Sequence, residues 1–374
     1  MYAGWLRRAA PESRVSFPAD VQQQKPGLAA GFCFFFEATK NQEITSVSKA
    51  DALSGILVTG GAGFVGTHLL QALLQDAAVG RIYVLDRQAP AIADPRIEFL
   101  QADLRRAVEI PVPEVKTCIH LAALAREPGF EWNEYFLDNY QGTRNLVDWL
   151  HRGGVDNLVY VSTAMAFKAG DVRHAENDVP DANTAYGISK LLGEEVARSW
   201  LAGAAGRRLR IVRPGVIFGC GGGGNFARLY SGLKRHLFFF IGRDSTVKSA
   251  IYVKDMARLL RFLVSDEGPY QVFHAVYPEP TTIRRVCDAF CEAYGWKRRV
   301  LTVPYGLAYL GALSFMALNA LGLRNPIHYR LIQKLHQSTD LSSDQLAEVG
   351  FKLQWSLVEA IRDWSRDCGG GRLY

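Results

Sequence analysis

The chain has 374 residues, of which 48% are hydrophobic and 21% are charged, and this balance excludes a disordered or low-complexity protein. The net charge of +6 is mild and no dense stripe of lysine and arginine appears, so nucleic acid is not expected as a partner. The length accommodates two domains, or one large α/β domain with a smaller lobe.

The N-terminal segment, residues 1–53, carries Pro, Gln and Ser without sustained periodicity, and we expect a poorly ordered extension there. Its one apolar run, Phe32 to Phe36, is too short to form a domain. The segment after Arg8 lacks the apolar core of a secretory signal, so no such signal is expected.

A glycine-rich turn joins the first predicted strand, residues 54–58, to the first predicted helix, residues 67–74. The turn, residues 59–66, reads Thr-Gly-Gly-Ala-Gly-Phe-Val-Gly. Its three spaced glycines permit a tight bend, close approach of a phosphate and packing of the helix on the strand, in the order Gly60, Gly63 and Gly66. Backbone N–H groups at the positive end of the helix therefore predict a pyrophosphate site.

An acidic residue follows the glycine-rich turn at an informative spacing along the sequence. The second predicted strand, residues 81–85, ends at Asp86, which lies twenty residues past Gly66. At this spacing a carboxylate binds the adenosine ribose of a dinucleotide. The segment therefore predicts a dinucleotide-binding unit.

Strands and helices continue to alternate after Asp86. Further strands are predicted at residues 97–100, 116–121, 158–162 and 209–212, with helices at 135–150 and 185–201. Such alternation predicts an α/β fold, a Rossmann-type doubly wound parallel sheet. We expect residues 54–215 to form mainly this NAD(P)-binding domain.

The remaining residues, 216–374, are expected to form mainly a smaller C-terminal substrate-binding lobe. A glycine-rich loop at residues 220–224 opens this range, after which the pattern becomes irregular. Helices are predicted near residues 256–264, 283–294, 305–321 and 357–364.

A tyrosine and a lysine lie four residues apart in the predicted helix 185–201. Tyr186 and Lys190 therefore share one helix face. We expect the ammonium to stabilise the phenolate and to lower the tyrosine pKa toward neutrality, as a catalytic base requires. Ser162 or Thr163, at the end of the predicted strand 158–162, can bond the substrate oxygen.

The six cysteines suggest no disulfide framework, and a reducing cytoplasm fits their spacing best. Cys287 and Cys291 lack a second ligand pair, so two buried thiols are expected and no metal site. The apolar stretch from Leu307 to Leu323 is shorter than a membrane span needs, and we interpret it as a packed helix of the lobe. A monotopic membrane contact is the alternative.

Together these motifs resemble the extended short-chain dehydrogenase/reductase family, in its NAD-dependent sugar-nucleotide epimerase/dehydratase branch. The resemblance covers about residues 55–366. The residues that carry it are Thr59 to Gly66, Asp86, Asp103-Leu104, His120 to Ala123, Asn139, Gly142-Thr143, Ser162-Thr163, Tyr186 to Lys190, Arg213 to Gly215 and Phe218-Gly219.

The resemblance implies a role for each matching residue. The pyrophosphate is held at Gly60, Gly63, Phe64, Val65 and Gly66. Asp86 takes the adenosine ribose, and Arg87 beside it leaves NADP possible although the carboxylate favours NAD. Asp103 and Leu104 flank the adenine, Ala122 and Ala123 line the cofactor, and Lys190 grips the nicotinamide ribose.

Catalysis is implied for Tyr186, Lys190 and Thr163. Substrate contacts are implied for Ser162, Thr163, Asn225 and Lys248, the last standing where many members carry an arginine. Ala164-Met165 replace the Asp-Glu pair of family dehydratases, so dehydration is not expected. Val216 stands where epimerases often carry a substrate-contacting asparagine, and the same segment is similar to the 3β-hydroxysteroid dehydrogenase branch.

We therefore predict an NAD(P)-dependent epimerase or ketoreductase acting on a nucleotide-sugar. The alternatives are a 3β-hydroxysteroid-dehydrogenase-like oxidoreductase at a membrane surface and a non-catalytic dinucleotide-sensing protein. The resemblance further implies a homodimer and a cytoplasmic role in polysaccharide biosynthesis.

Overall fold

The computed structural model describes residues 53–127, 129–311, 335–370 and 373. These residues belong to one compact unit that spans Thr45–Tyr374. The expected N-terminal extension lies outside the described residues, apart from Leu53.

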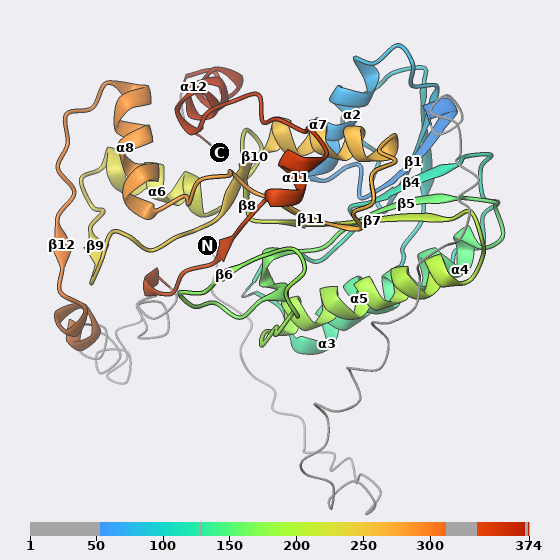
Figure 1. The fold of residues 1–374 in the computed structure, drawn as a ribbon. Coiled ribbons are helices and arrows are strands. Elements are labelled where there is room, and N and C mark those ends of the chain that lie inside the picture. The colour runs from blue at the N-terminus through green and yellow to red at the C-terminus, as the bar shows by residue number, and fades with distance from the viewer. Residues whose placement is uncertain (1–52, 128, 312–334, 371–372, 374) are drawn as a thin grey trace, which may run out of the picture. The chain divides into compact units, whose positions relative to one another are not determined.

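A seven-stranded, fully parallel sheet forms the centre of this unit (Figure 1). Its spatial order is β11-β7-β5-β4-β1-β2-β3. The strands are β1 (Gly55–Thr59), β2 (Arg81–Asp86), β3 (Ile97–Gln101), β4 (Thr117–His120), β5 (Asn157–Val161), β7 (Arg208–Pro214) and β11 (Val272–Ala275). The chain builds outward from β1 to β3 and then returns to β4, so the order reverses between β1 and β4. In an open parallel sheet, ligands bind at such a reversal, beyond the carboxyl ends of the strands.

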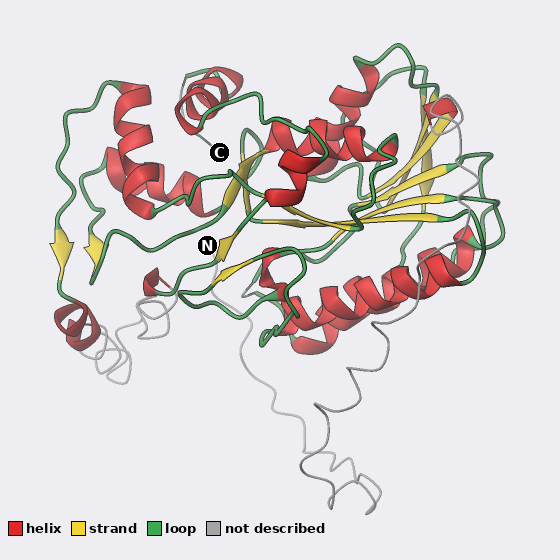
Figure 2. Ribbon diagram, viewed as in Figure 1, coloured by secondary structure: helices red, strands yellow, loops and turns green. Residues whose placement is uncertain are grey.

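Helices cover both faces of the sheet, as Figure 1 and Figure 2 show. On one face, α2 (Phe64–Leu74) packs with α7 (Val253–Val264) through buried residues such as Leu69, Leu73 and Leu260. On the other face, α4 (Gly142–Leu150) and α5 (Ala185–Ala202) bury Trp149 and Trp200. The predicted doubly wound α/β fold is confirmed.

The predicted helix 135–150 is not uniform. It begins as α3 (Trp132–Tyr135), loosens into a π-helical segment over Phe136–Gln141 and tightens again into α4. The irregular turn brings the side chain of Asn139 into the interior, where it is fully buried. Single π-helical turns are frequent at functional sites.

Short paired strands and further helices, most of them from the C-terminal half, lie beyond the main sheet. The strand pairs, all parallel, are β8 (Val216–Phe218) with β10 (Ala250–Tyr252), β9 (Phe240–Ile241) with β12 (Thr302–Val303), and β6 (Arg173–His174) with β13 (Asp340–Leu341). The helices are α6 (Asn225–Lys234), α8 (Ile283–Tyr294), α11 (Asp344–Glu348) and α12 (Leu357–Asp367). Phe218, Tyr230, Phe290 and Trp364 form the aromatic core that joins most of them.

Two elements return from this half to the main sheet. β11 is the seventh strand and α7 covers its face, although both come from the range 216–374 that we expected to be mainly the lobe. The Val-Phe-His-Ala sequence of β11 is too short and mixed to stand out as a strand. This segment forms a strand because it pairs with β7.

The cysteines correct one expectation. Cys220 and Cys368 form a disulfide with a Cα–Cα distance of 5.8 Å, across a sequence separation of 148 residues. Spacing along the chain could not reveal this pair, because folding alone brings α12 to the glycine-rich loop. The disulfide also removes the basis for expecting a reducing compartment. Cys287 is buried and Cys291 is half-buried.

The apolar stretch 307–323 lies mostly outside the described residues; only its start, residues 307–311, is described, and it is helical. Within the described parts of the chain, no helix is both long and apolar enough to cross a membrane.

Candidate active site

The glycine-rich turn leaves room that side chains would fill. Gly60 has a φ of +71°, and a Cβ there would lie 2.6 Å from the backbone nitrogen of Ala122. A Cβ at Gly66 would lie 2.3 Å from the carbonyl oxygen of Gly60. Gly63 caps α2 with no side chain, so the first N–H groups of the helix remain open to a ligand. Because an anion is stabilised at a helix N-terminus, these residues fit a dinucleotide pyrophosphate.

Asp86 sits beside this turn at the end of β2. Its Oδ2 accepts a 3.0 Å hydrogen bond from the Ala62 N–H, and its Oδ1 accepts one of 2.6 Å from the Arg87 N–H. The carboxylate is therefore fixed by backbone donors while remaining partly exposed. The Arg87 side chain is exposed on the same loop.

A buried polar chain supports the next stretch of the predicted cofactor site. Thr59 Oγ1 lies 2.6 Å from His120 Nδ1, and His120 Nε2 lies 3.1 Å from Thr143 Oγ1. The Thr59 hydroxyl also accepts a 3.2 Å bond from the Ala122 N–H. Burial holds the pKa of His120 well below its usual range, so the imidazole is neutral and the chain positions Ala122 without adding charge.

The predicted adenine-flanking residues follow β3. Asp103 Oδ1 accepts a 3.0 Å bond from the Arg105 N–H, which orders the turn. Leu104 is nearly buried, and its carbonyl accepts a 2.7 Å bond from Asn145 of α4. Asp103 is half-exposed and Ala123 is exposed, whereas Val65 packs against the core.

Thr163 and Tyr186 meet at the carboxyl end of β5. Thr163 caps a short 3₁₀ turn, Ala164–Ala166, and its Oγ1 accepts a 3.1 Å bond from the Met165 N–H. The Thr163 side chain also acts to lower the pKa of the Tyr186 phenol. Both side chains are less than 9% exposed, so the two hydroxyls share a nearly dry position. A Cβ at Gly187 would lie 2.2 Å from the Met165 carbonyl, so the glycine allows α5 to approach this turn.

The expected effect of Lys190 on the tyrosine is wrong for this structure. Burial raises the pKa of Tyr186 to about 12, the Thr163 side chain offsets this rise only in part, and the Glu127 and Tyr135 side chains raise the pKa further. The Lys190 ammonium instead lies 4.3 Å from the centre of the Tyr160 ring, and burial lowers the pKa of Lys190 to about 7. Lys190 is therefore only partly protonated near neutral pH, whereas the Tyr186 phenol stays protonated.

Below this pair lies an ionic network that the sequence motifs did not reveal. Glu194, one turn after Lys190, accepts two bonds from the Arg213 guanidinium, at 2.9 Å and 2.7 Å. It also accepts a 2.6 Å bond from Ser162 Oγ. All three residues are buried, so the Ser162 hydroxyl is directed to Glu194 in this structure. The sequence offers only two signals of this network: Glu194 lies four residues after Lys190, and Arg213 directly follows a predicted strand. Before the fold is known, both look like ordinary charged surface residues.

Asn139 braces the same region from the π-helical segment. Its Oδ1 accepts a 2.8 Å bond from the Leu124 N–H, and its Nδ2 donates a 3.0 Å bond to Ser189 Oγ. Ser189 in turn donates to the Tyr186 carbonyl. Asn139 thus ties the loop after β4 to the helix that carries Tyr186 and Lys190.

The loop after β8 reaches the cofactor turn from the C-terminal half. The Cys220 carbonyl lies 2.9 Å from His68 Nε2 of α2, and a Cβ at Gly222 would lie 2.6 Å from the Phe64 ring. Asn225 begins α6 directly after this loop and is exposed. Lys248 donates a 2.5 Å bond from its Nζ to the Gln337 carbonyl. These two predicted substrate contacts thus come from separate segments.

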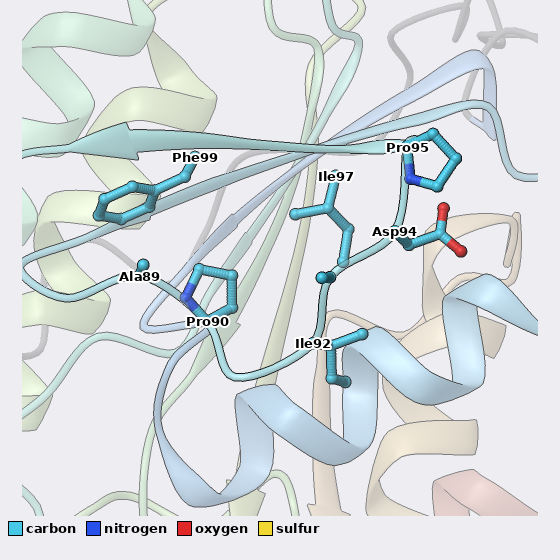
Figure 3. Close-up of a pocket in the computed structure, with 8 residues that line it drawn as sticks. Ala89, Pro90, Ile92, Asp94, Pro95, Ile97 and Phe99 are labelled. Carbon is cyan, nitrogen blue, oxygen red and sulfur yellow. The ribbon is translucent and has the colours of Figure 1, made fainter.

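A pocket of about 480 Å³ lies elsewhere, between the loop after β2 and the edge strand β3 (Figure 3). Its lining is mostly apolar and includes Pro90, Ile92 and Phe99. None of the predicted site residues line it. We take the carboxyl ends of β1, β4 and β5 as the candidate active site, because the glycine turn and the paired hydroxyls lie there, whereas the pocket offers a single carboxylate, Asp94.

Comparisons with known proteins agree with this geometry. The family described as "NAD dependent epimerase/dehydratase family" matches residues 56–274, more than half of the chain. The N-acetyl-alpha-D-glucosaminyl-diphospho-ditrans,octacis-undecaprenol 4-epimerase of Escherichia coli O157:H7 is 25% identical over 82% of this chain and 92% of its own length. The 3 beta-hydroxysteroid dehydrogenase/Delta 5-->4-isomerase of Mycobacterium tuberculosis is 30% identical over 67% of this chain and 73% of its own length.

Among solved structures, UDP-N-acetylglucosamine 4-epimerase from Bacillus cereus has the same fold, with a TM-score of 0.64 and 20% identity. The match covers 85% of this chain and 97% of that one. The glycine turn and the Tyr186–Lys190 pair lie inside the range that the family matches.

Proposed function

Because this chain belongs to the NAD-dependent epimerase/dehydratase family, we propose that it is an epimerase of a hexose carried on a diphosphate, with a nucleotide-sugar as the substrate class. The observation that carries the proposal is the burial of the Thr163, Tyr186 and Lys190 side chains together at the carboxyl end of β5, near the reversal of a parallel sheet. The undecaprenol-linked substrate in the name of the O157:H7 relative has the same sugar–diphosphate chemistry on a lipid.

The dinucleotide would be held along the glycine turn and the strand ends. Gly60, Gly63, Phe64, Val65 and Gly66 would take the pyrophosphate. Asp86 would take the adenosine ribose beside Arg87, Asp103 and Leu104 would flank the adenine, and Ala122, Ala123 and Lys190 would line the nicotinamide half. When bound, the cofactor supplies the acceptor and donor of a hydride.

The chain's own residues handle the proton. In the first step Tyr186 acts as the phenolate and takes the proton of the reacting hydroxyl. It then returns that proton to the keto oxygen, and Thr163 bonds the same oxygen. The raised pKa of Tyr186 favours the protonated phenol, which is the form that donates in the return step. Asn225 and Lys248 are assigned to the substrate diphosphate, with Lys248 acting as a point charge.

Dehydration is disfavoured by the residues after Thr163. Ala164 and Ala166 are buried and Met165 is apolar, so this turn offers no carboxylate to remove water. A ketoreductase remains the second candidate, since it uses the same Tyr186 and Thr163 for the return step alone.

A product assay separates the candidates. Purified full chain is incubated with UDP-glucose or UDP-N-acetylglucosamine and catalytic NAD, and the sugars are resolved by anion-exchange chromatography. The proposal expects partial conversion to the 4-epimer with no net change in absorbance at 340 nm. Net NADH consumption with a 4-keto sugar would favour the ketoreductase. Turnover only with a 3β-hydroxysteroid would overturn the proposal. No turnover of any of these substrates, with dinucleotide binding that Tyr186→Phe leaves unchanged, would favour a sensor.

A further inference from the structure

One corner of the C-terminal half exposes large apolar side chains. Leu237, Phe239, Leu301, Leu307 and Leu310 have exposed fractions of 71%, 47%, 74%, 62% and 60%. We call these five residues the apolar corner. Large exposed apolar groups on one surface mark a site of interaction more often than an isolated one does.

The backbone holds the two halves of the apolar corner together. β9 and β12 pair side by side, and the Phe240 N–H donates a 2.8 Å bond to the Leu301 carbonyl (Figure 1). Phe239 therefore lies beside Leu301 at the start of the pair. The helical residues 305–311 follow β12 directly and carry Leu307 and Leu310.

Basic side chains surround the apolar corner. Lys234 and Arg235 end α6 just before Leu237, whereas Lys297 and Arg299 precede Leu301, and all four are exposed. Arg298 links the basic residues before Leu301 to the end of α6, because its guanidinium donates to the Leu233 carbonyl. The sequence contains no Asp or Glu between residues 225 and 243 or between 293 and 339.

We propose that the apolar corner and these basic residues dock the protein on an anionic membrane surface. Leucine and phenylalanine enter the boundary of the acyl chains, while lysine and arginine pair with anionic headgroups. A second copy of the chain is the weaker occupant, because a symmetric contact would bring like basic residues together. The docking goes beyond the proposed catalytic function and is read out without turnover.

Vesicle flotation of the full chain tests the docking. Neutral phosphatidylcholine vesicles are compared with vesicles that also contain phosphatidylglycerol, at low and high salt. We expect binding to the anionic vesicles and a fall in the bound fraction as salt rises, because screening weakens the headgroup contacts. No binding to anionic vesicles at low salt would overturn the proposal.

Two paired variants locate the contact. Leu237→Asp with Leu301→Asp, and separately Lys297→Glu with Arg299→Glu, should each lower vesicle affinity by roughly tenfold or more. The matched controls are Val172→Asp with Val179→Asp, at exposed valines outside the corner, and Lys168→Glu with Lys352→Glu, at exposed lysines elsewhere. These controls should bind as the parent does.

Folding is verified by thermal melting, and the charge-reversal pair keeps the test decisive if the leucine pair is unstable. Equal binding by both paired variants and the parent would overturn the proposal. So would a dimer-to-monomer change in the leucine pair that leaves vesicle affinity unchanged, since the corner would then join two copies. Failure of the epimerase assay leaves the flotation result intact, so the two proposals fail independently.

Discussion

Ser162 donates a 2.6 Å hydrogen bond to Glu194, and the same carboxylate receives a two-pronged bond from Arg213. Ser162 directly precedes Thr163, and Glu194 lies one turn beyond Lys190 on α5. We infer that the buried carboxylate couples the position of Thr163, the predicted catalytic threonine, to the charge state of Lys190. We therefore propose Glu194 as a positioning residue, because its bonds reach Ser162 and Arg213 and its charge acts on Lys190.

Glu194→Gln should shift the pH profile. Burial lowers the pKa of Lys190, and the Glu194 charge opposes this, so removing the charge lowers the lysine pKa further. If turnover needs protonated Lys190, the alkaline limb of the kcat profile moves to lower pH. The parent limb is expected near pH 7.

Ser162→Ala is the matched control, because it removes a bond to Glu194 and keeps the charge. Its kcat should fall modestly while the alkaline limb stays in place. Glu194→Gln also leaves Arg213 without its ionic partner, which should cost about 3–5 kcal/mol of unfolding free energy in urea titration. An unmoved alkaline limb in a folded Glu194→Gln protein would contradict the coupling.

Tyr186→Phe should lower kcat by roughly 100-fold to 10,000-fold, the range for a lost proton-transfer group. Tyr135→Phe is the control: its ring lies 6.1 Å from that of Tyr186, but its hydroxyl donates to the Arg126 carbonyl. Steady-state kinetics of both variants checks the assignment. Equal losses in the two would argue that packing, rather than the Tyr186 hydroxyl, sets the rate.

Gly60→Ala should abolish measurable dinucleotide binding and destabilise the fold by about 1–3 kcal/mol, because φ is positive and the new methyl meets the Ala122 backbone. Gly223→Ala provides the comparison, since no atom lies within 4 Å of a Cβ there. NAD titration by calorimetry and urea unfolding measure both effects. Normal NAD affinity in folded Gly60→Ala would place the pyrophosphate elsewhere.

Asp86→Ala should reduce the preference for NAD over NADP, because the carboxylate repels a 2′-phosphate. The ratio of the two Kd values is the readout. Arg87→Ala should move the ratio the other way, toward NAD. A ratio unaffected by either substitution would remove the adenosine ribose from this position.

His274 makes stability depend on pH. Burial lowers the pKa of His274 to about 3, so the unfolded chain binds the proton first as pH falls below the ordinary histidine value of about 6.5. Stability contributed by the neutral ring is complete above pH 6.5 and declines below it, by about 2 kcal/mol between pH 7 and pH 5. Urea midpoints of the parent and of His274→Gln test this, and an equal pH dependence in both would assign it to other groups.

The dinucleotide-binding half was predictable because its signals are local. The strand–glycine turn–helix unit at residues 54–74 and the helices at 185–201 and 283–294 follow from short patterns, and they are confirmed with small shifts at the ends. The family, the enzyme class and the nicotinamide cofactor predicted from these residues are also confirmed. The domain boundaries, the roles of individual site residues, the homodimer and the cytoplasmic location remain predictions.

What the sequence missed depends on contacts between distant segments. β11 is a strand because β7 pairs with it, and the Cys220–Cys368 disulfide joins residues 148 apart. The tyrosine pKa was misjudged for the same reason. Helical spacing places Lys190 near Tyr186, but the side chain direction is set by the Tyr160 ring, on a different strand.

Epimerisation by hydride transfer is tested by proton NMR of UDP-glucose and UDP-N-acetylglucosamine turned over by the full chain with NAD in deuterium oxide. Hydride transfer at C4 predicts a 4-epimer that keeps its proton at C4, formed by the parent and at least roughly 100-fold more slowly by Tyr186→Phe. Deuterium at C4, an epimer formed equally by Tyr186→Phe, or no conversion of either sugar would contradict it.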